Sequence, residues 1–220
     1  MTTSDGGLAE RFHRLQAGMQ QACAAAGRHI DDVRLVAVGK RHPASSIERL
    51  YALGQRDFGE SYVQELVEKQ RQLAHLPDIR WHFIGRVQKN KAKQMASCFT
   101  VHGASAARHV RALVDAGAER ILLQVNLSDE AQKNGVAPDA LRAMWPDVDV
   151  PQLQGLMTLP APGHGREAFA ALRELRDALQ TSAHPLPQLS MGMSGDYADA
   201  IAEGATLIRV GTALFGPRPT

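Results

Sequence analysis

Residues Leu35–Lys40 read LVAVGK, an apolar, β-branched run that ends abruptly on a lysine. Continuous apolar runs of this kind are typical of parallel strands buried on both faces. The carboxyl end of such a strand brings the Lys40 amine to the edge of the core, where desolvation favours its neutral form. A neutral amine in a pocket forms a Schiff base with an aldehyde or ketone. The alternative is a lysine whose stem packs while its amine reaches water.

Strand-like and helix-like stretches alternate along the chain. An amphipathic opening helix carries Leu8, Phe12, Leu15 and Met19 and is expected to end near Gly27. Eight strands are then predicted, at Val33–Lys40, Arg56–Glu60, Ile79–Gly85, Cys98–His102, Arg120–Asn126, Gln152–Thr158, Leu186–Met193 and Thr206–Gly211. Among the helices between them, one predicted apolar stripe consists of Val63, Leu66, Val67 and Leu73.

Eight strands with intervening helices in 220 residues predict an α/β fold, a single (β/α)8 TIM barrel with an extra N-terminal helix. We expect residues 1–220 to form one domain. Gly54, Gly117 and Gly204 stand where helices should stop before the next strand. A doubly wound open sheet is the alternative that periodicity leaves open. The missing GxGxxG after the first strand weakens its dinucleotide-binding version.

Composition narrows the classes of function. A net charge of +2 gives no strong reason to invoke nucleic acid or an anionic membrane. No apolar stretch approaches the ~20 residues that span a bilayer, and the start MTTSDGGLAE lacks the features of a secretory signal. Cys23 and Cys98 suggest no disulfide framework, and Cys98, His102 and His109 do not follow a recognised metal pattern. A cytoplasmic protein without a metal is therefore expected.

Two loops have the composition of a phosphate site. The segment Ser190–Asp196, SMGMSGD, follows the seventh predicted strand, and Arg209–Thr212, RVGT, ends the eighth. In α/β barrels the loops after strands 7 and 8 commonly hold phosphate, since small residues let backbone N–H groups approach an anion. Ser194 is suited to cap the next helix or to donate its hydroxyl, and the helix amino terminus adds partial positive charge. Asp196 must point away. An ordinary tight turn is the alternative.

Arg209 lies within an apolar strand, where arginine is almost never fully buried without a partner. One interpretation is an ion pair with an acidic neighbour such as Glu60. The other is a hydrogen-bond donor to a ligand inside the barrel. Together with Lys40 and the two loops, Arg209 favours a site for a small phosphorylated ligand.

The chain resembles the YggS/PROSC family of pyridoxal 5′-phosphate (PLP) homeostasis proteins, relatives of the amino-terminal barrel of alanine racemase. The resemblance runs nearly end to end and is carried by motifs in the family's order. These are LVAVGK (35–40), FGESYVQE (58–65), WHFIGRVQKNK (81–91), QVNLSDEAQKNG (124–135), GLMTLPAP (155–162), LSMGMSGD (189–196) and IRVGTALFG (208–216).

The resemblance implies that PLP is the cofactor and that the fold is like the alanine racemase N-terminal domain. It implies that Lys40 forms the Schiff base with the PLP aldehyde. It further implies that Met193, Ser194, Gly211 and Thr212 hold the phosphate.

The resemblance also places residues around the pyridine ring. Arg209 would face the ring nitrogen, as in alanine racemases, while His82, Met157 and the segment around Glu60 and Ser61 would line the pocket. Two positions depart from the family pattern. Gly39 stands where serine usually precedes the lysine, and Ser61 stands where the family usually has an asparagine near the ring. Neither removes the lysine or the phosphate loops, so we expect binding to survive.

Three functions remain to be distinguished. The first is a non-enzymatic PLP binder, because an arginine on the ring nitrogen leaves it unprotonated and a poor electron sink. The second is a racemase-like PLP enzyme. In alanine racemases a second domain and a partner subunit supply the second base, and Tyr51, Tyr62 and Tyr197 offer no evident substitute. The third is an isomerase or aldolase that acts on a sugar phosphate through Lys40. The resemblance favours the first, a monomer with PLP-dependent apoenzymes as candidate partners.

Overall fold

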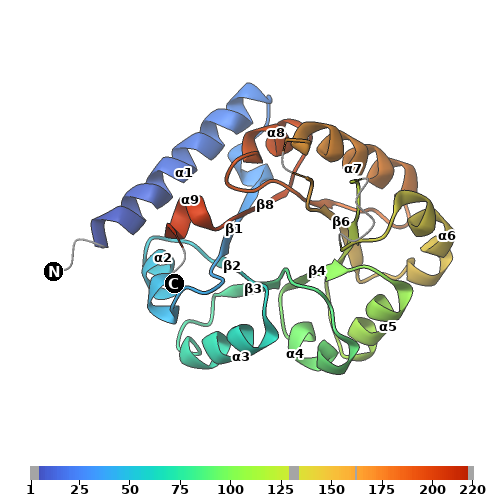
Figure 1. Cartoon of the computed structure of the whole chain (residues 1–220), viewed down its shortest axis with the longest axis horizontal. Coiled ribbons are helices and arrows are strands. Elements are labelled where there is room, and N and C mark those ends of the chain that lie inside the picture. The colour runs from blue at the N-terminus through green and yellow to red at the C-terminus, as the bar shows by residue number, and fades with distance from the viewer. Residues whose placement is uncertain (1–4, 129–133, 162, 218–220) are drawn as a thin grey trace.

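Eight parallel strands close into a barrel in sequence order, β1 to β8, with β8 paired back to β1 (Figure 1). This computed structural model describes residues 5–128, 134–161 and 163–217. The strands are β1 Arg34–Val38, β2 Asp57–Glu60, β3 Arg80–Phe83, β4 Thr100–Ala104, β5 Ile121–Val125, β6 Leu153–Thr158, β7 Gln188–Ser190 and β8 Leu207–Val210. The (β/α)8 barrel is confirmed, and the open sheet is wrong because the first and last strands share hydrogen bonds.

Helices surround the strands. They are α1 Asp5–Ala25, α2 Ala44–Ala52, α3 Val63–Gln72, α4 Ala92–Ala96, α5 Ala107–Asp115, α6 Pro138–Val148, α7 Gly165–Leu179, α8 Tyr197–Ala202 and α9 Thr212–Phe215, with short 3₁₀ turns η1 Ile30–Asp32 and η2 Lys89–Lys91. Gly54, Gly117 and Gly204 follow α2, α5 and α8 with φ of 97°, 89° and 94°, so they end these helices as predicted.

The extra amino-terminal helix lies across one side of the barrel. All four apolar residues of its predicted stripe are buried, and α1 packs against α8 and α9 (Figure 1). Arg11 on α1 donates hydrogen bonds to the carbonyl groups of Leu214 and Phe215 at 2.8 and 3.2 Å. The helix therefore supports the end of the chain that follows β8.

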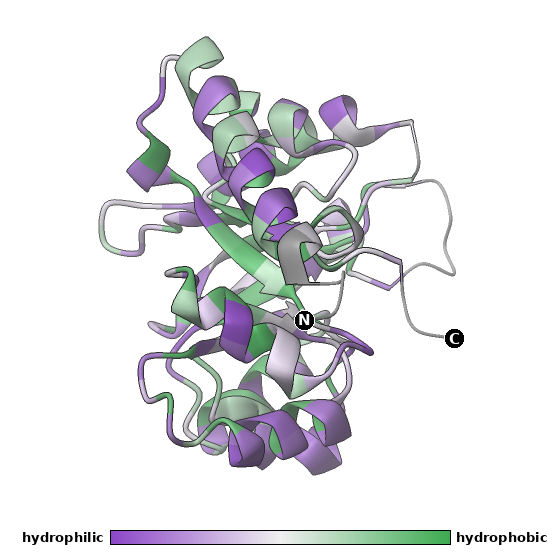
Figure 2. Cartoon of the chain, turned by 90° about the vertical axis from the view of Figure 1, so that its left-hand side faces the viewer, coloured by the Kyte–Doolittle hydropathy of each residue, from purple (hydrophilic) through white to green (hydrophobic). Residues whose placement is uncertain are grey.

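The strands are rich in buried apolar residues, and β1 is apolar on both faces over Leu35–Ala37, as the opening motif predicted. Their green ribbons in Figure 2 lie between helices of mixed hydropathy. Alternate side chains of a strand point outward to the helices or inward to the barrel. The inward set includes a small separate cluster of Val36, Leu122, Met157 and Leu207, at most 2% exposed. Packed interiors of this kind leave the carboxyl ends of the strands as the place for a ligand.

Two strands differ from their predicted bounds. The fourth, predicted at Cys98–His102, forms at Thr100–Ala104, so His102 lies inside the strand rather than at its end. The seventh, predicted at Leu186–Met193, is reduced to Gln188–Ser190. Gly192 turns the chain out of the sheet with φ 90°, and Pro187 has no N–H to donate. The loop that carries Ser194 is consequently longer than expected.

Candidate functional site

One pocket at the carboxyl ends of the strands gathers eight of the nine residues predicted for the cofactor. Its volume is about 370 Å³, within the range of small-molecule sites. The predicted residues that line it are Lys40, Ser61, Met157, Met193, Ser194, Arg209, Gly211 and Thr212, joined by Val38, Ile84, Leu159 and Gly195. Strands β1, β6 and β8 and the loops after β2 and β7 thus converge as the sequence predicted.

Lys40 follows β1 and is half-buried at the pocket. Its Nζ atom lies 4.7 Å from the centre of the Tyr62 ring, a contact that the sequence analysis did not anticipate. A hydrogen bond from Lys40 and its positive charge lower the pKa of the Tyr62 hydroxyl. The next residue, Arg41, has φ 63°, and its backbone N–H donates to Glu65 Oε2 at 2.9 Å. Left-handed backbone at a non-glycine residue is strained and must be held by its surroundings.

A buried lysine supports the other side of Lys40. Lys69 on α3 donates to the Gly39 carbonyl at 2.8 Å and to Glu60 Oε1 at 2.6 Å. Its Nζ also lies 3.5 Å from Glu65 Oε2. We call Glu60, Glu65 and Lys69 the rim network. Through it, hydrogen bonds hold the backbone both before and after Lys40.

Glu60 is the costly member of the rim network. It is fully buried, and its Oε2 atom has no hydrogen-bond partner in the described part of the chain. Burial raises the pKa of this carboxyl to about 7, against the opposing charge of Lys69. The predicted alternative pairing of Glu60 with Arg209 is not what forms. The lysine of α3 takes that place.

The loop after β7 has the small residues and open donors of an anion site. Within the described residues, the backbone N–H groups of Ser194 and Gly195 have no partner. Ser194 Oγ accepts a hydrogen bond from the Ala213 amide at 3.2 Å, which ties this loop to the turn after β8. Asp196 turns back onto the loop, where its Oδ1 accepts from the Met193 amide at 2.6 Å. That amide is therefore occupied, and Met193 contributes its place in the pocket wall instead.

Helix dipoles contribute less than the sequence suggested. The helices that follow the two loops, α8 and α9, contain only 6 and 4 residues. Partial charge at a helix end comes from aligned peptide units, and few are aligned here. Amide and hydroxyl groups, rather than helix dipoles, are therefore the main donors that this loop pair offers to an anion.

Arg209 is 3% exposed and reaches the pocket from inside the barrel. One terminal nitrogen donates to Ser190 Oγ at 2.6 Å and the other to the Thr158 carbonyl at 2.8 Å. Burial lowers the pKa of the guanidinium to about 10, so it stays charged at neutral pH. These two contacts fix the plane of the guanidinium relative to the pocket.

His82, the ninth predicted residue, does not line the pocket. It is fully buried inside the barrel, where its Nε2 lies 2.9 Å from Asp57 Oδ1 and its Nδ1 lies 2.9 Å from His102 Nε2. His102 Nδ1 lies in turn 2.8 Å from Ser190 Oγ, the hydroxyl that binds Arg209. We call Asp57, His82, His102, Ser190 and Arg209 the interior chain. The sequence predicted His82 in the pocket wall, whereas its side chain packs inside the barrel.

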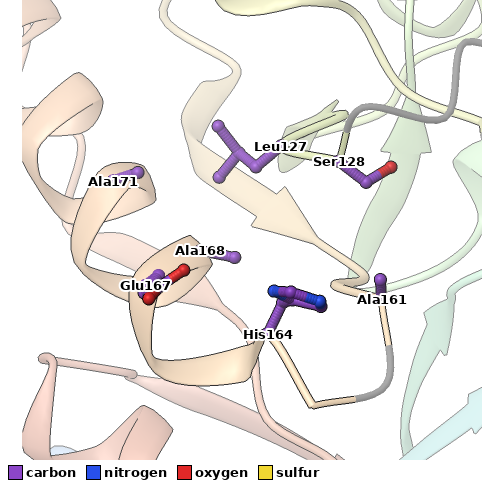
Figure 3. Close-up of a pocket in the computed structure, with 7 residues that line it drawn as sticks. All are labelled: Leu127, Ser128, Ala161, His164, Glu167, Ala168 and Ala171. Carbon is purple, nitrogen blue, oxygen red and sulfur yellow. The ribbon is translucent and has the colours of Figure 1, made fainter.

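Outside the Lys40 pocket and the barrel interior, the structure has a further pocket that contains none of the predicted cofactor residues. A second pocket of about 360 Å³ lies between the end of β5 and helix α7, with Leu127, Ser128, His164 and Glu167 in its wall (Figure 3). Residues 129–133, part of the QVNLSDEAQKNG motif, and Pro162 lie outside the described residues. Across the described ranges, no His, Cys, Asp and Glu side chains group as metal ligands, and no helix is long and apolar enough to cross a membrane.

Comparison with known proteins places the chain in a family. The family described as "Alanine racemase, N-terminal domain" matches residues 14–219. The pyridoxal phosphate homeostasis protein of Pseudomonas aeruginosa is 43% identical over 221 residues, 96% of each chain. This chain belongs to the family of pyridoxal phosphate homeostasis proteins. The resemblance inferred from its motifs is confirmed.

Solved structures of relatives agree with the fold. PipY of Synechococcus elongatus, solved with PLP bound, is 37% identical with a TM-score of 0.83 over 95% of this chain and 100% of that one. An alanine racemase from Corynebacterium glutamicum is 15% identical with a TM-score of 0.68, over 93% of this chain and 60% of that one. The homeostasis proteins therefore share the barrel fold with the racemase.

Proposed function

We propose that this protein binds PLP in the Lys40 pocket and holds it as a reversible Schiff base, in the service of PLP homeostasis. One observation carries the proposal. A half-buried amine, a buried guanidinium and a loop with open backbone donors converge on one pocket of about 370 Å³. The PLP bound to the relative PipY, 37% identical, supports the same ligand here.

Each pocket residue has a role in this proposal. Lys40 supplies the amine for the PLP aldehyde. The Ser194 and Gly195 amides and the Ser194 and Thr212 hydroxyls bind the phosphate, and Gly211 lets the backbone approach it. Arg209 donates to the pyridine nitrogen.

The remaining pocket residues surround the pyridine ring in this proposal. Met157 and Met193 give it apolar contact, and Ser61 gives it a small polar neighbour. With serine instead of the family's asparagine at position 61, we expect weaker contact with the ring and retained binding.

The electrostatics of Arg209 favour holding the cofactor over turning it over. PLP supplies an electron sink to enzymes when its ring nitrogen is protonated. A guanidinium that remains charged donates a hydrogen bond and gives no proton to that nitrogen. We therefore propose a binder that is not an enzyme and that releases PLP to PLP-dependent apoenzymes, with the chain acting as a monomeric single domain in the cytoplasm.

The deciding experiment compares visible spectra of the purified protein with PLP, before and after borohydride. We expect a yellow protein that borohydride bleaches, with the label on Lys40 when the protein is digested. Lys40→Ala should lose the imine band, while the matched variant Lys93→Ala, changed at an exposed lysine of α4, should keep it. The same band in Lys40→Ala would show that another amine holds PLP.

Two further measurements separate the alternative functions. A racemase-like enzyme exchanges the α-proton of a small amino acid with solvent, so deuterium incorporation into alanine at the rate of a working enzyme would overturn the non-catalytic role. A sugar-phosphate aldolase or isomerase would be colourless with PLP, and borohydride would trap Lys40 only after a sugar phosphate is added.

A further inference from the structure

The interior chain connects the pocket to the opposite half of the barrel through five polar side chains, each from a different strand. Asp57 begins β2, and Arg80 on β3 holds its carboxylate with hydrogen bonds of 2.9 and 2.5 Å. His82 and His102 come from β3 and β4. Ser190 and Arg209 come from β7 and β8, so His102 and Ser190 meet although they are 88 residues apart. Closure of the barrel alone brings them together.

With both imidazoles neutral, donor and acceptor chemistry gives the interior chain one direction, because the ionised Asp57 carboxylate at its end can only accept a hydrogen bond from His82. A guanidinium only donates, so Ser190 Oγ accepts from Arg209 and its own hydrogen is available for His102 Nδ1. His102 then carries its hydrogen on Nε2 and donates to His82 Nδ1. His82 likewise carries its hydrogen on Nε2 and donates to the Asp57 carboxylate. Every link, from 2.6 to 2.9 Å, has one donor and one acceptor.

Both imidazoles stay neutral in this arrangement. Burial lowers the pKa of His82, against the hydrogen bond and charge of Asp57, with Arg34 and Arg80 also nearby. Burial lowers the pKa of His102 further, and His82 and Arg209 act in the same direction. The Ser190 hydroxyl can rotate in principle. Because it donates its hydrogen to His102, however, its oxygen presents a lone pair to the Arg209 guanidinium. The tautomers of two histidines thereby decide how Ser190 meets Arg209.

We propose that His82 and His102 are positioning residues for the cofactor: through Ser190 they lock Arg209 in the orientation in which it binds the pyridine nitrogen. This inference rests on the proposed function for the role of Arg209. The hydrogen bonds of the interior chain, by contrast, exist in the protein without cofactor. The Asp57 carboxylate is the fixed end, because Arg80 holds both of its oxygens.

The alternative is that the side chains of the interior chain only satisfy one another's hydrogen-bonding groups in the core. A merely structural chain stabilises the fold but has no effect on the electronics of a bound ring. If the interior chain positions Arg209, breaking it should weaken the hydrogen bond from Arg209 to the pyridine nitrogen. The electron density of the ring then changes, and with it the pKa of the imine on Lys40. The pKa of the imine is therefore the readout that distinguishes the two.

The first test uses the protein without cofactor. Long-range ¹H–¹⁵N NMR of the histidine rings at about pH 8 should show two histidines, assigned through His82→Gln and His102→Gln, that are neutral and carry their one ring hydrogen on Nε2. A hydrogen on His102 Nδ1, or a second ring hydrogen on either residue at that pH, would overturn the inference.

The second test breaks the chain next to the pocket. Ser190→Ala should still form the borohydride-reducible imine on Lys40, but should bind PLP about 10-fold more weakly, the equivalent of one net hydrogen bond, and shift the imine pKa. Ser190→Thr keeps the hydroxyl and should restore both values. Thr100→Val on β4, two residues from His102, removes a buried hydroxyl outside the chain and should match the wild type.

The outcomes separate the two proposals. A folded Ser190→Ala with wild-type affinity and imine pKa would show that the chain is structural only. Wild-type protein that gives no imine on Lys40 would contradict the proposed function, while the NMR result on the cofactor-free protein still tests the chain. His82→Gln and His102→Gln are needed only for assignment, so the inference does not depend on their stability.

Discussion

The two ends of strand β2 carry buried carboxylates that behave in opposite ways. Asp57 begins the strand, and although burial opposes it, hydrogen bonds from His82 and Arg80 lower its pKa. Glu60 ends the strand, and burial raises its pKa to about 7 despite Lys69. Only two residues of extended chain, Phe58 and Gly59, separate a satisfied carboxylate from one with an orphaned oxygen. Donor count decides the difference, since both side chains are at most 4% exposed.

The two carboxylates belong to networks that use their hydrogen-bond donors differently. The interior chain is complete and gives Arg209 a fixed orientation. The rim network divides one ammonium among Glu60, Glu65 and the Gly39 carbonyl, and this is what holds the backbone around Lys40. A single cation serving three acceptors is the weaker arrangement, so the rim network should be the more sensitive to change.

The largest effect is expected from Lys69→Met, which removes that cation. Breaking a buried ion pair from one side costs about 3–5 kcal/mol, because the remaining charge is left uncompensated. Urea unfolding at pH 8 measures the loss. Lys93→Met makes the same change at an exposed position and should stay within about 0.5 kcal/mol of the wild type. Equal losses in both variants would refute the role of the rim network.

The second prediction concerns pH. Because the pKa of Glu60 is about 7 in the folded protein against an ordinary 4.5, the folded state keeps a proton that the unfolded state releases. Stability from this group is therefore fully present below about pH 4.5 and lost as pH rises to about 7. The unfolding free energy of wild type minus that of Glu60→Gln should fall by on the order of 2 kcal/mol across this window. A flat difference curve would show that folding leaves the pKa of Glu60 unchanged.

A third, smaller effect tests the satisfied end of β2. Arg80→Met should cost only about 1–2 kcal/mol, because Asp57 keeps its hydrogen bond from His82 and the arginine is 41% exposed. Urea unfolding of Arg80→Met and Lys69→Met under the same conditions compares the two losses of unfolding free energy. A loss as large as that of Lys69→Met would mean that donor count does not distinguish the two carboxylates.

The smallest effect is expected at Gly39, where the family usually has serine. A Cβ atom there would lie 2.9 Å from Glu60 Oε1, so Gly39→Ala forces the carboxylate to move without a new hydrogen bond. Gly39→Ser makes the same demand but brings a hydroxyl donor to a carboxylate with an orphaned oxygen. We expect the serine variant to be more stable than the alanine variant by about 1 kcal/mol in thermal unfolding. The reverse order would show that the hydroxyl does not reach Glu60.

Local patterns predicted the site because its main groups follow strands directly. Lys40 ends an apolar run, and the small-residue loops follow β7 and β8, so closing the barrel was enough to bring them together. The stripe predicted for α3 was wrong in part: Val67 is 42% exposed, while Lys69 is buried. Sequence patterns assign a lysine to solvent, and its burial follows from acceptors supplied by β1 and β2.

The sequence by itself predicted the (β/α)8 barrel, the family and nine cofactor residues, eight of which line one pocket, since strand periodicity, loop composition and motif order are written in consecutive residues. Only the tertiary structure decided that His82 lies below the pocket and that Lys69 stands behind Lys40. Those positions depend on partners up to 30 residues apart, and on whether each buried donor finds an acceptor when the barrel closes. Hydrogen bonding in a closed interior is a property of the assembled strands, so no local stretch of sequence contains it.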